Sequence, residues 1–479
     1  MVRSQLRLAL VALLAIGCAG ESSPAGDEAQ DASVGEVKTK KKAPKTKKKT
    51  GKGKGKAKAE TETAKAKVSF GSKVRGLRLN RSIVVRATPD LDGEKLGTVA
   101  AHTVVGWQQA VEGAGCDQRW IEIVPRGWVC EGYLEPVGDR PGGVELPKLR
   151  AGERVPGTYG KVFGEDALLT TIEDGAVVSE TPIVGSSTVR KRGSAVVDDV
   201  EYWKIDGGKF VAVQFLRPHD PSSFQGERLF DGRRADKPMA FAISSNRPGD
   251  WVVVRDTPGG KRVRRLAPRT LVSLEGDKKN SDGTIAGYFL SDDEFIAAAD
   301  LRHVHIQEPP PLTEPNERWF DVDLDSQILV AYEGAAPVYA TLISSGTRKN
   351  PTETGIFRIW IKFSETSMSG RMGESDAYSV ATVPWTQFYE NDFALHTSYW
   401  HDHFGQQRSH GCVNLSPRDS RFLYFWSEPQ VPIGWSMANA SSERPGSMVR
   451  VHSKNDPEPE FKGAALKVQR ARLAAAANP

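Results

Sequence analysis

At 479 residues the chain is long enough for several domains, and its composition is ordinary for a globular protein apart from its beginning. The formal net charge of +5 comes from one segment, because residues 38–67 hold 14 lysines and two glutamates. The remainder of the chain is therefore net negative, which excludes a basic folded domain.

The first residues predict an export signal. Arg3 and Arg7 supply positive charge, and residues 8–17 form an apolar run that is too short to span a bilayer as a stable helix. The run ends in LLAIGC, which resembles a bacterial lipobox. We therefore expect residues 1–17 to be a lipoprotein signal peptide and Cys18 to carry the lipid, with a plain secretory signal as the alternative. Ala19 after Cys18 favours the outer over the inner membrane, with the chain on its periplasmic face.

The lysine-rich segment lies within residues 18–70, which cannot bury a core and are expected to form a disordered tether. An exported chain is not expected to meet nucleic acid. Anionic lipid headgroups or wall polymers are the expected partners of the lysines, unless the tether is only a self-repelling spacer.

The middle of the chain repeats itself weakly. Three related motifs, VVRATP, VVSETP and VVRDTP, end at Pro89, Pro182 and Pro258. Each is followed by an aromatic–aliphatic stretch expected to be a strand: WVCEGYLEP from Trp128, FVAVQFLRP from Phe210 and FIAAADLRH from Phe295. Short strands and glycine turns predict small β-barrels. They resemble bacterial Src-homology-3-like domains, which we expect over residues 71–140, 155–220 and 238–306, either binding wall peptides or acting as spacers.

The four cysteines separate by position. Cys116 and Cys130 flank WIEIVPRGWV, which predicts a hairpin, so we expect a disulfide in the first barrel. Because Cys18 is the expected lipid site, Cys412 has no partner. An odd thiol in an exported protein is buried, metal-bound or reactive.

The surroundings of Cys412 are those of a strand followed by a helix. The stretch FALHTS is apolar up to His396, which should end a buried strand. In LSPRDSRFLYFW, Ser416 suits a helix N-cap and Pro417 the first helical position. On that helix, one face would carry Phe422, Phe425 and Trp426. A thiol just before a helix N-terminus is expected to have a lowered pKa.

Two kinds of chemistry compete for this histidine-rich stretch. Zinc would find four candidate ligands, namely His401, His403, His410 and Cys412. However, the stretch looks like a loop, and no CxxC or HExxH pattern supports a metal. We therefore favour a cysteine nucleophile with His396 as its base, and expect His401 and His403 to be exposed loop residues.

The sequence SHGCVN at residues 409–414, with ALHTSYWHDHFG upstream, resembles the signature of the L,D-transpeptidase catalytic domain family. VDLDSQIL, PTETGIF and VPWTQFY precede it in the matching order, so the resemblance covers residues 317–452 and leaves 453–479 as a polar tail. It implies a β-sandwich with a short helix after the cysteine, and hence a mainly β chain. Two features depart from the family: the spacing from His396 to Ser409 is short, and Asn414 stands where many members have arginine.

The resemblance also implies roles. Cys412 is the nucleophile, His396 exchanges protons, and the backbone carbonyl of Thr397 orients His396. Backbone amides around Gly411 and Cys412 form an oxyanion hole. Substrate-binding positions would be Ser409, His410, Asn414, Tyr399 and Trp400, with core packing as the alternative for Tyr399 and Trp400. The aromatic VPWTQFY stretch would line the groove, and the polar insert SETSMSGRMGESDAYS would be a lid or a long loop.

The implied reaction is acyl transfer on peptidoglycan stem peptides, with release of D-alanine and formation of a 3→3 cross-link. No metal or cofactor is implied. The alternatives are an L,D-carboxypeptidase, an enzyme that attaches a protein to the wall, and a non-catalytic wall-binding lipoprotein.

Overall fold

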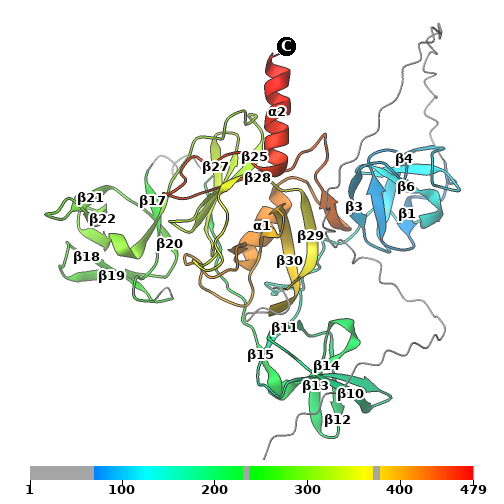
Figure 1. Ribbon diagram of the computed structural model, residues 1–479, viewed down its shortest axis with the longest axis horizontal. Helices are drawn as coiled ribbons and strands as arrows, with labels where there is room; N and C mark the ends of the chain where they lie inside the picture. The colour runs from blue at the N-terminus through cyan, green and yellow to red at the C-terminus, as the bar shows by residue number, and fades with distance from the viewer. Residues whose placement is uncertain (1–68, 230–236, 248, 370–377, 478–479) are drawn as a thin grey trace, which may run out of the picture. The chain divides into compact units, whose positions relative to one another are not determined.

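The computed structural model describes residues 69–229, 237–247, 249–369 and 378–477. The expected signal peptide, the lipid site Cys18 and nearly all of the tether lie outside the described residues, as do residues 370–377 of the polar insert. The described part forms 34 strands and two α-helices, which confirms a mainly β fold (Figure 1). No helix in this part is long and apolar enough to cross a membrane.

Three groups of short strands precede the last domain. The first group is β1 (Gly76–Leu79), β2 (Ile83–Arg86), β3 (Lys95–Val99), β4 (Val104–Val111), β5 (Trp120–Val124), β6 (Trp128–Cys130) and β7 (Leu134–Val137). The second is β8 (Tyr159–Val162), β9 (Leu168–Glu173), β10 (Ala176–Pro182), β11 (Ser186–Arg190), β12 (Gly193–Val197), β13 (Val200–Lys204), β14 (Phe210–Ala212) and β15 (Leu216–Pro218). The third is β17 (Met239–Ala242), β18 (Val252–Arg255), β19 (Arg262–Leu266), β20 (Thr270–Ser273), β21 (Gly276–Lys279), β22 (Ile285–Ser291), β23 (Glu294–Ala297) and β24 (Leu301–Val304). We keep for them the names first, second and third barrel; that they are Src-homology-3-like barrels stays a prediction.

The barrels share one local structure at their ends. Where the sequence predicts a single strand, each barrel has a strand, one 3₁₀ turn and a second strand. The turns are η1 (Glu131–Tyr133), η3 (Val213–Phe215) and η4 (Ala298–Asp300). In each, the N–H of the leucine that follows the turn donates to the carbonyl of the first turn residue. The repeated sequence thus forms, in each case, a 3₁₀ turn that separates two short strands.

Among the described residues, one disulfide is present, and it lies in the first barrel. Cys116 and Cys130 are joined, with their Cα atoms 5.7 Å apart. β5 and β6 between them form an antiparallel hairpin in which Trp120 lies opposite Cys130. The bond therefore ties the segment before the hairpin to its second strand.

The last domain has two facing sheets. One has the order β16-β27-β26-β25-β34-β28. Its strands are β16 (Glu227–Arg228), β25 (Arg318–Asp323), β26 (Ile328–Glu333), β27 (Ala336–Leu342), β28 (Gly355–Arg358) and β34 (Met448–His452). The facing strands are β29 (Ile361–Ser369), β30 (Tyr378–Glu390), β31 (Phe393–Thr397), β32 (Val413–Leu415) and β33 (Trp435–Asn439).

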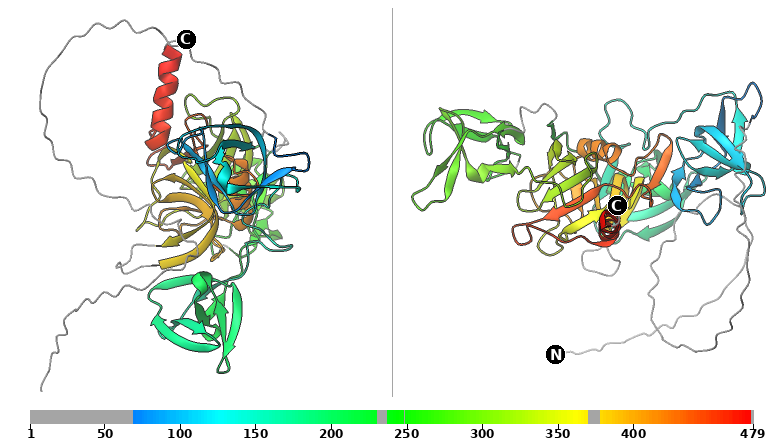
Figure 2. Two further views of the ribbon diagram at one scale, coloured as in Figure 1. Left: turned by 90° about the vertical axis from the view of Figure 1, so that its right-hand side faces the viewer. Right: turned by 90° about the horizontal axis from the view of Figure 1, so that it is seen from above.

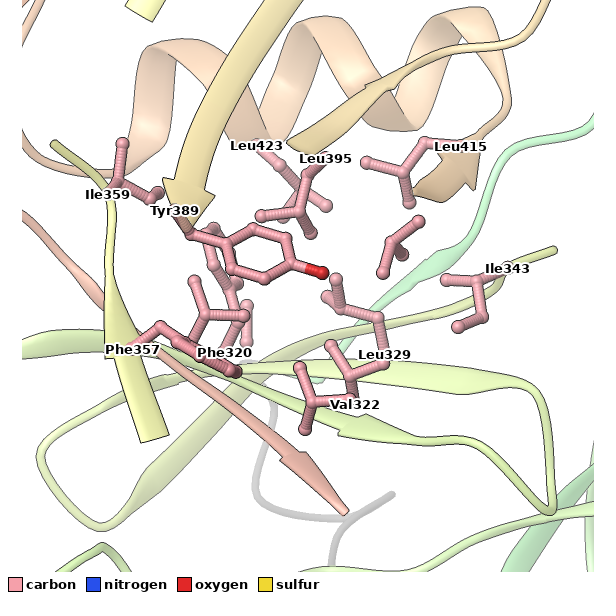
Figure 3. Close-up of a cluster of buried hydrophobic side chains, with 14 of the residues drawn as sticks. Phe320, Val322, Leu329, Ile343, Phe357, Ile359, Tyr389, Leu395, Leu415 and Leu423 are labelled. Carbon is pink, nitrogen blue, oxygen red and sulfur yellow. The ribbon is translucent and has the colours of Figure 1, made fainter. Parts of the chain in front are cut away.

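The core lies between these sheets and beneath helix α1 (Pro417–Trp426) (Figure 3). Phe320 and Leu329 enter it from the first sheet, Leu395 and Leu415 from the second, and Leu423 from the helix. All five are fully buried, so this cluster fixes β31 and β32 against the first sheet.

Helix α1 begins as its sequence predicts and packs on two cores. The Ser416 hydroxyl accepts from the Asp419 N–H at 3.2 Å. Leu423 is fully buried in the sandwich and Tyr424 in the core of the first barrel. The aromatic residues predicted to share one face are partly buried against the same two cores, namely Phe422, Phe425 and Trp426.

A buried lysine closes the other end of α1. Lys362 Nζ donates to the carbonyls of Tyr424 and Ser427 at 2.7 and 2.6 Å. These belong to the carbonyls that a helix end leaves without intrahelical partners. Both ends of the helix that follows the cysteine are therefore held by side chains.

Residues 453–479 are not only a polar tail. They include helix α2 (Gly463–Ala477), drawn in red in Figures 1 and 2. Its alanine-rich sequence has a high helix propensity. Ala465 packs in the cluster of Trp319 and Met448, and Arg472 pairs with Glu317 at 2.7 Å, so the segment joins the domain.

Strand pairing joins the first and second barrels to the last domain. β3 pairs antiparallel with β33, and β11 pairs parallel with β30. The third barrel instead shares a core, because Phe241 packs in one cluster with Trp319 and Leu342. The described residues accordingly belong to one compact unit.

Candidate active site

Two adjacent parallel strands carry the candidate catalytic residues. β31 and β32 pair so that His396 lies opposite Asn414. Side chains of partner residues point to the same side of a sheet, and alternation gives Cys412, two residues before Asn414, the same side. Cys412, His396 and Asn414 accordingly line one cavity of about 260 Å³.

The turn that presents Cys412 requires glycine. Gly411 has φ +121°, a conformation that side chains rarely adopt, and an added Cβ would lie 2.6 Å from the Phe393 ring. The Thr352 hydroxyl donates to the Gly411 carbonyl at 2.7 Å. Thr352, to which the sequence assigned no role, thus fixes the peptide that precedes the thiol.

Ser409 stabilises the same turn. Its hydroxyl donates to the Cys412 carbonyl at 2.5 Å and accepts from the Gly411 N–H at 3.1 Å. Of the two backbone amides expected at the oxyanion hole, the Gly411 N–H already has an acceptor in this turn. The N–H of Cys412 remains as the candidate donor. Ser409 also borders the cavity, so its predicted contact with a substrate stays a prediction.

His396 is held in one orientation and kept neutral. It is 3% exposed, and its Nδ1 lies 2.9 Å from the Thr397 carbonyl. A carbonyl only accepts, so Nδ1 carries the proton and Nε2 is the basic nitrogen. Burial lowers the pKa of His396 to about 4, against a smaller opposite effect of the Thr397 carbonyl.

The Cys412 thiol does not have the lowered pKa expected from the helix. Burial raises its pKa to about 11, partly offset by the backbone at Ala394. The reason is that β32 separates Cys412 from α1, and Ser416 already takes the Asp419 N–H. The thiol donates to the Asp392 carbonyl at 3.5 Å. At neutral pH the cavity is thus lined by a neutral thiol and a neutral imidazole.

Asn414 and His401 form a second polar pair at the cavity. The Asn414 side-chain amide lies 3.0 Å from His401 Nε2, and the His403 N–H donates to His401 Nδ1 at 3.2 Å. Because Nδ1 accepts, neutral His401 carries its proton on Nε2 and needs an acceptor there. Asn414 Oδ1 is buried without a partner among the described residues, so an amide turned by 180° would let Oδ1 accept from His401 Nε2.

The remaining predicted residues separate into cavity and core. His410 and Trp400 line the cavity. Tyr399 does not: it is fully buried, donates to the Ala381 carbonyl at 2.8 Å, and its ring lies 4.1 Å from that of Tyr159.

Two further expectations are corrected by burial. His401 is not an exposed loop residue, and burial lowers its pKa to about 3. The aromatic VPWTQFY stretch does not line a groove, because Trp385 and Tyr389 are buried in the first-barrel core and the sandwich core. Among the described residues, no three His, Cys, Asp or Glu side chains are arranged to hold a metal ion.

One wall of the cavity comes from the second barrel, which the sequence did not connect with the site. The residues are Lys161, Ser186, Thr188 and His219. They lie about 200 residues before Cys412 in the chain, and no local pattern marks them.

Comparison with solved structures finds L,D-transpeptidases among the similar proteins. A mutant L,D-transpeptidase of Enterococcus faecium is 24% identical and is matched over 30% of this chain and 51% of its own, with a TM-score of 0.24. The L,D-transpeptidase of Stackebrandtia nassauensis is 24% identical over 31% and 58%, with a TM-score of 0.22. That of Mycobacterium smegmatis is 15% identical over 50% and 89%, with a TM-score of 0.23. The chain thus spans about half the length of the first two.

The search of curated proteins returned no match. The scan against family models matches residues 317–455, which contain the cysteine, the histidine and both sheets of the last domain. This confirms the family resemblance predicted from the sequence for that segment. Residues 317–455 match the YkuD family, the L,D-transpeptidase catalytic domain.

Proposed function

We propose that this chain is a peptidoglycan L,D-transpeptidase that forms 3→3 cross-links by acyl transfer through Cys412. The observation that carries the proposal is the shared cavity of Cys412 and His396 inside the segment that matches the family. A nucleophilic thiol, an oriented neutral imidazole and a tight turn with a backbone N–H are the parts that acyl transfer needs.

The acylation step begins from the neutral pair. The thiol turns from the Asp392 carbonyl, and Sγ attacks the carbonyl carbon of the third stem residue while its proton passes to His396 Nε2. The Cys412 N–H supports the developing oxyanion. The bond to the terminal D-alanine breaks, its amine takes the proton from His396, and a thioester remains.

The second step reverses these roles. The amine of an acceptor stem attacks the thioester, its proton passes to His396 Nε2, and the C–S bond breaks. The thiolate then recovers the proton, which returns the neutral pair. Each proton transfer in the two steps joins His396 to Cys412 or to an amine of the substrates.

The low pKa of His396 suits this sequence of transfers. A base whose pKa is about 4 stays unprotonated at neutral pH and releases its proton readily to the leaving amine. It is a weak base for a thiol of pKa about 11, so proton transfer and attack on the carbonyl should occur together. In the acylation step no free thiolate is then formed before the attack.

We also propose, from the sequence, that the enzyme is a lipoprotein held at the periplasmic face of a bacterial membrane through Cys18. The lysine-rich tether would place the folded unit at a distance from the bilayer and near the wall.

The test uses the full mature chain, a disaccharide-tetrapeptide and mass analysis of the products. The expected result is a dimer that has lost one D-alanine, and its absence with Cys412→Ala. A loss of D-alanine without dimer would indicate water as the acceptor. Undiminished turnover by Cys412→Ala would overturn the assignment of the nucleophile.

A further inference from the structure

The second barrel supplies an unassigned part of the active-site cavity. Lys161 lies on β8, Ser186 and Thr188 on β11, and His219 directly follows β15. These three strands are neighbours in one sheet, in the order β15-β8-β11. The residues therefore form a continuous wall and not a chance approach of one loop.

The wall is fixed to the catalytic strands. β11 pairs parallel with β30, with Thr188 opposite Val380. Arg190, which is 4% exposed, forms an ion pair with Glu365 of β29. The Thr382 hydroxyl donates to Asp206 at 2.8 Å. A strand pairing, a buried ion pair and a hydrogen bond hold this barrel in a fixed position beside Cys412.

His219 presents an unused polar atom in this wall. Its Nε2 is buried and has no hydrogen-bond partner among the described residues. The backbone N–H of His219 donates to the Tyr159 carbonyl at 2.8 Å, and its ring lies 5.8 Å from the ring of Tyr399. Buried polar atoms in native proteins are nearly always satisfied, so a buried one without a partner, on a residue that lines the cavity, points to a missing polar partner such as a ligand atom.

Lys161 brings a positive charge to the same place. Among the described residues no carboxylate forms an ion pair with its ammonium group, and its charge helps burial to lower the pKa of His219 to about 4. His219 is therefore neutral at pH 7 and can donate one hydrogen bond. An ammonium and an imidazole N–H together suit a carboxylate.

We propose that Lys161 and His219 bind the terminal carboxylate of the donor stem peptide, which makes the second barrel a specificity-determining part of the active site. This carboxylate site rests on the proposed function, in which the donor stem peptide ends one residue beyond the cleaved bond. A residue spans at most about 3.6 Å, so a carboxylate-binding group must share the cavity of the thiol, as these two residues do.

The experiment compares two tetrapeptide donors, one with a free terminal carboxylate and one with a terminal carboxamide. The full mature chain should prefer the free acid. Lys161→Met should raise KM for the free acid about tenfold, with a smaller change in kcat, and leave KM for the amide unchanged. His219→Leu should act in the same direction, and His219→Gln, which keeps a donor, should be milder. Lys204→Met, an exposed lysine of β13 outside the cavity, is the matched control.

Two further measurements separate this proposal from the proposed function. Alkylation of Cys412 by neutral iodoacetamide should be unchanged in Lys161→Met, because that reagent carries no carboxylate. Binding of both peptides to the Cys412→Ala chain, followed by calorimetry, reports on the wall even if no turnover occurs. Equal binding of the free-acid peptide and the amide peptide would overturn the proposal, and so would no binding of either. It would also be overturned if Lys161→Met changed only the response to amidation of the side chain of the third stem residue.

Discussion

The second and third barrels have the same terminal strand–turn–strand structure but different relations to the active site. The second reaches the cavity through Lys161 and His219. In the third, the ring of His303 on β24 lies 4.7 Å from the ring of Tyr288 of the same barrel, tilted by 57°. The difference teaches that the repeated sequence determines the local fold, whereas the way each barrel docks determines whether it can contact a substrate.

The two docking modes explain the difference. The second barrel places the edge strand β11 beside β30, so the open face near β8 turns toward Cys412. The third barrel buries the face of β17 in a core with Trp319 and Leu342, away from the thiol. Its Arg269 still reaches Asp402, on the loop beside His401, at 2.6 Å. One barrel contacts the cavity directly and the other contacts it only through a loop.

The largest effect should come from the catalytic base, which neither barrel can replace. His396→Ala should lower the acylation rate by about 10²–10⁴-fold, the usual range for loss of acid–base help. Because its pKa is about 4, His396 stays neutral above that pH, so wild-type acylation should lose activity only near pH 4 and not near 6.5. Stopped-flow acylation across pH 3–8 measures this, and a decline centred near 6.5 would contradict the buried neutral imidazole.

The same shift predicts how stability depends on pH. The unfolded histidine takes up a proton near pH 6.5, while folded His396 does so only near 4. The unfolded state therefore binds more protons in that interval, and the free energy of unfolding should fall as the pH is lowered through it. His219 and His401, with lowered pKa values of about 4 and about 3, contribute in the same direction.

The second-largest effect should come from weakening the contact of the second barrel with the last domain. Arg190→Met removes the cation from Glu365, and loss of one partner of a buried pair is more harmful than loss of both. We expect KM for the free-acid donor to rise about tenfold, with restoration of part of that loss in the double variant Arg190→Met, Glu365→Gln. Steady-state kinetics on both donors measures this. An unchanged KM in the single variant would show that the cavity wall does not depend on this docking.

The catalytic half of the cavity could be predicted from the sequence because its residues lie close together in the chain. An apolar strand ending at His396, a glycine before Cys412 and a Ser416-Pro417 helix start are local signals. The wall residues Lys161 and His219 carry no such signal, since only the pairing of β11 with β30 brings them near the thiol. The raised pKa of Cys412 was missed for a related reason: burial is a property of the whole fold and here exceeds the local effect of a helix.

A smaller effect should come from His401, which acts on the substrate only through Asn414. His401→Ala removes the group that fixes the Asn414 amide at 3.0 Å. We expect a several-fold fall in kcat/KM, smaller than the tenfold effect expected at Arg190, with His401→Gln closer to wild type because its amide can replace the hydrogen bond. His403→Ala is the matched control, since that residue contributes its backbone N–H to His401. Equal activity of all three variants would show that Asn414 needs no such partner.

The smallest effect should come from the third barrel, and it tests the comparison most directly. Arg269 donates to both the side chain and the backbone carbonyl of Asp402 at 2.6 Å, but neither residue lines the cavity. Arg269→Met should therefore change kcat/KM by less than about twofold, because the loop beside His401 is also held by the Ser344 hydroxyl, which donates to the His403 carbonyl at 2.9 Å. The same donors and assay as for Arg190→Met make the two barrels directly comparable. If Arg269→Met instead raised KM for the free acid as much as Arg190→Met does, the two docking modes would be equivalent for catalysis, and the special place of the second barrel would be lost.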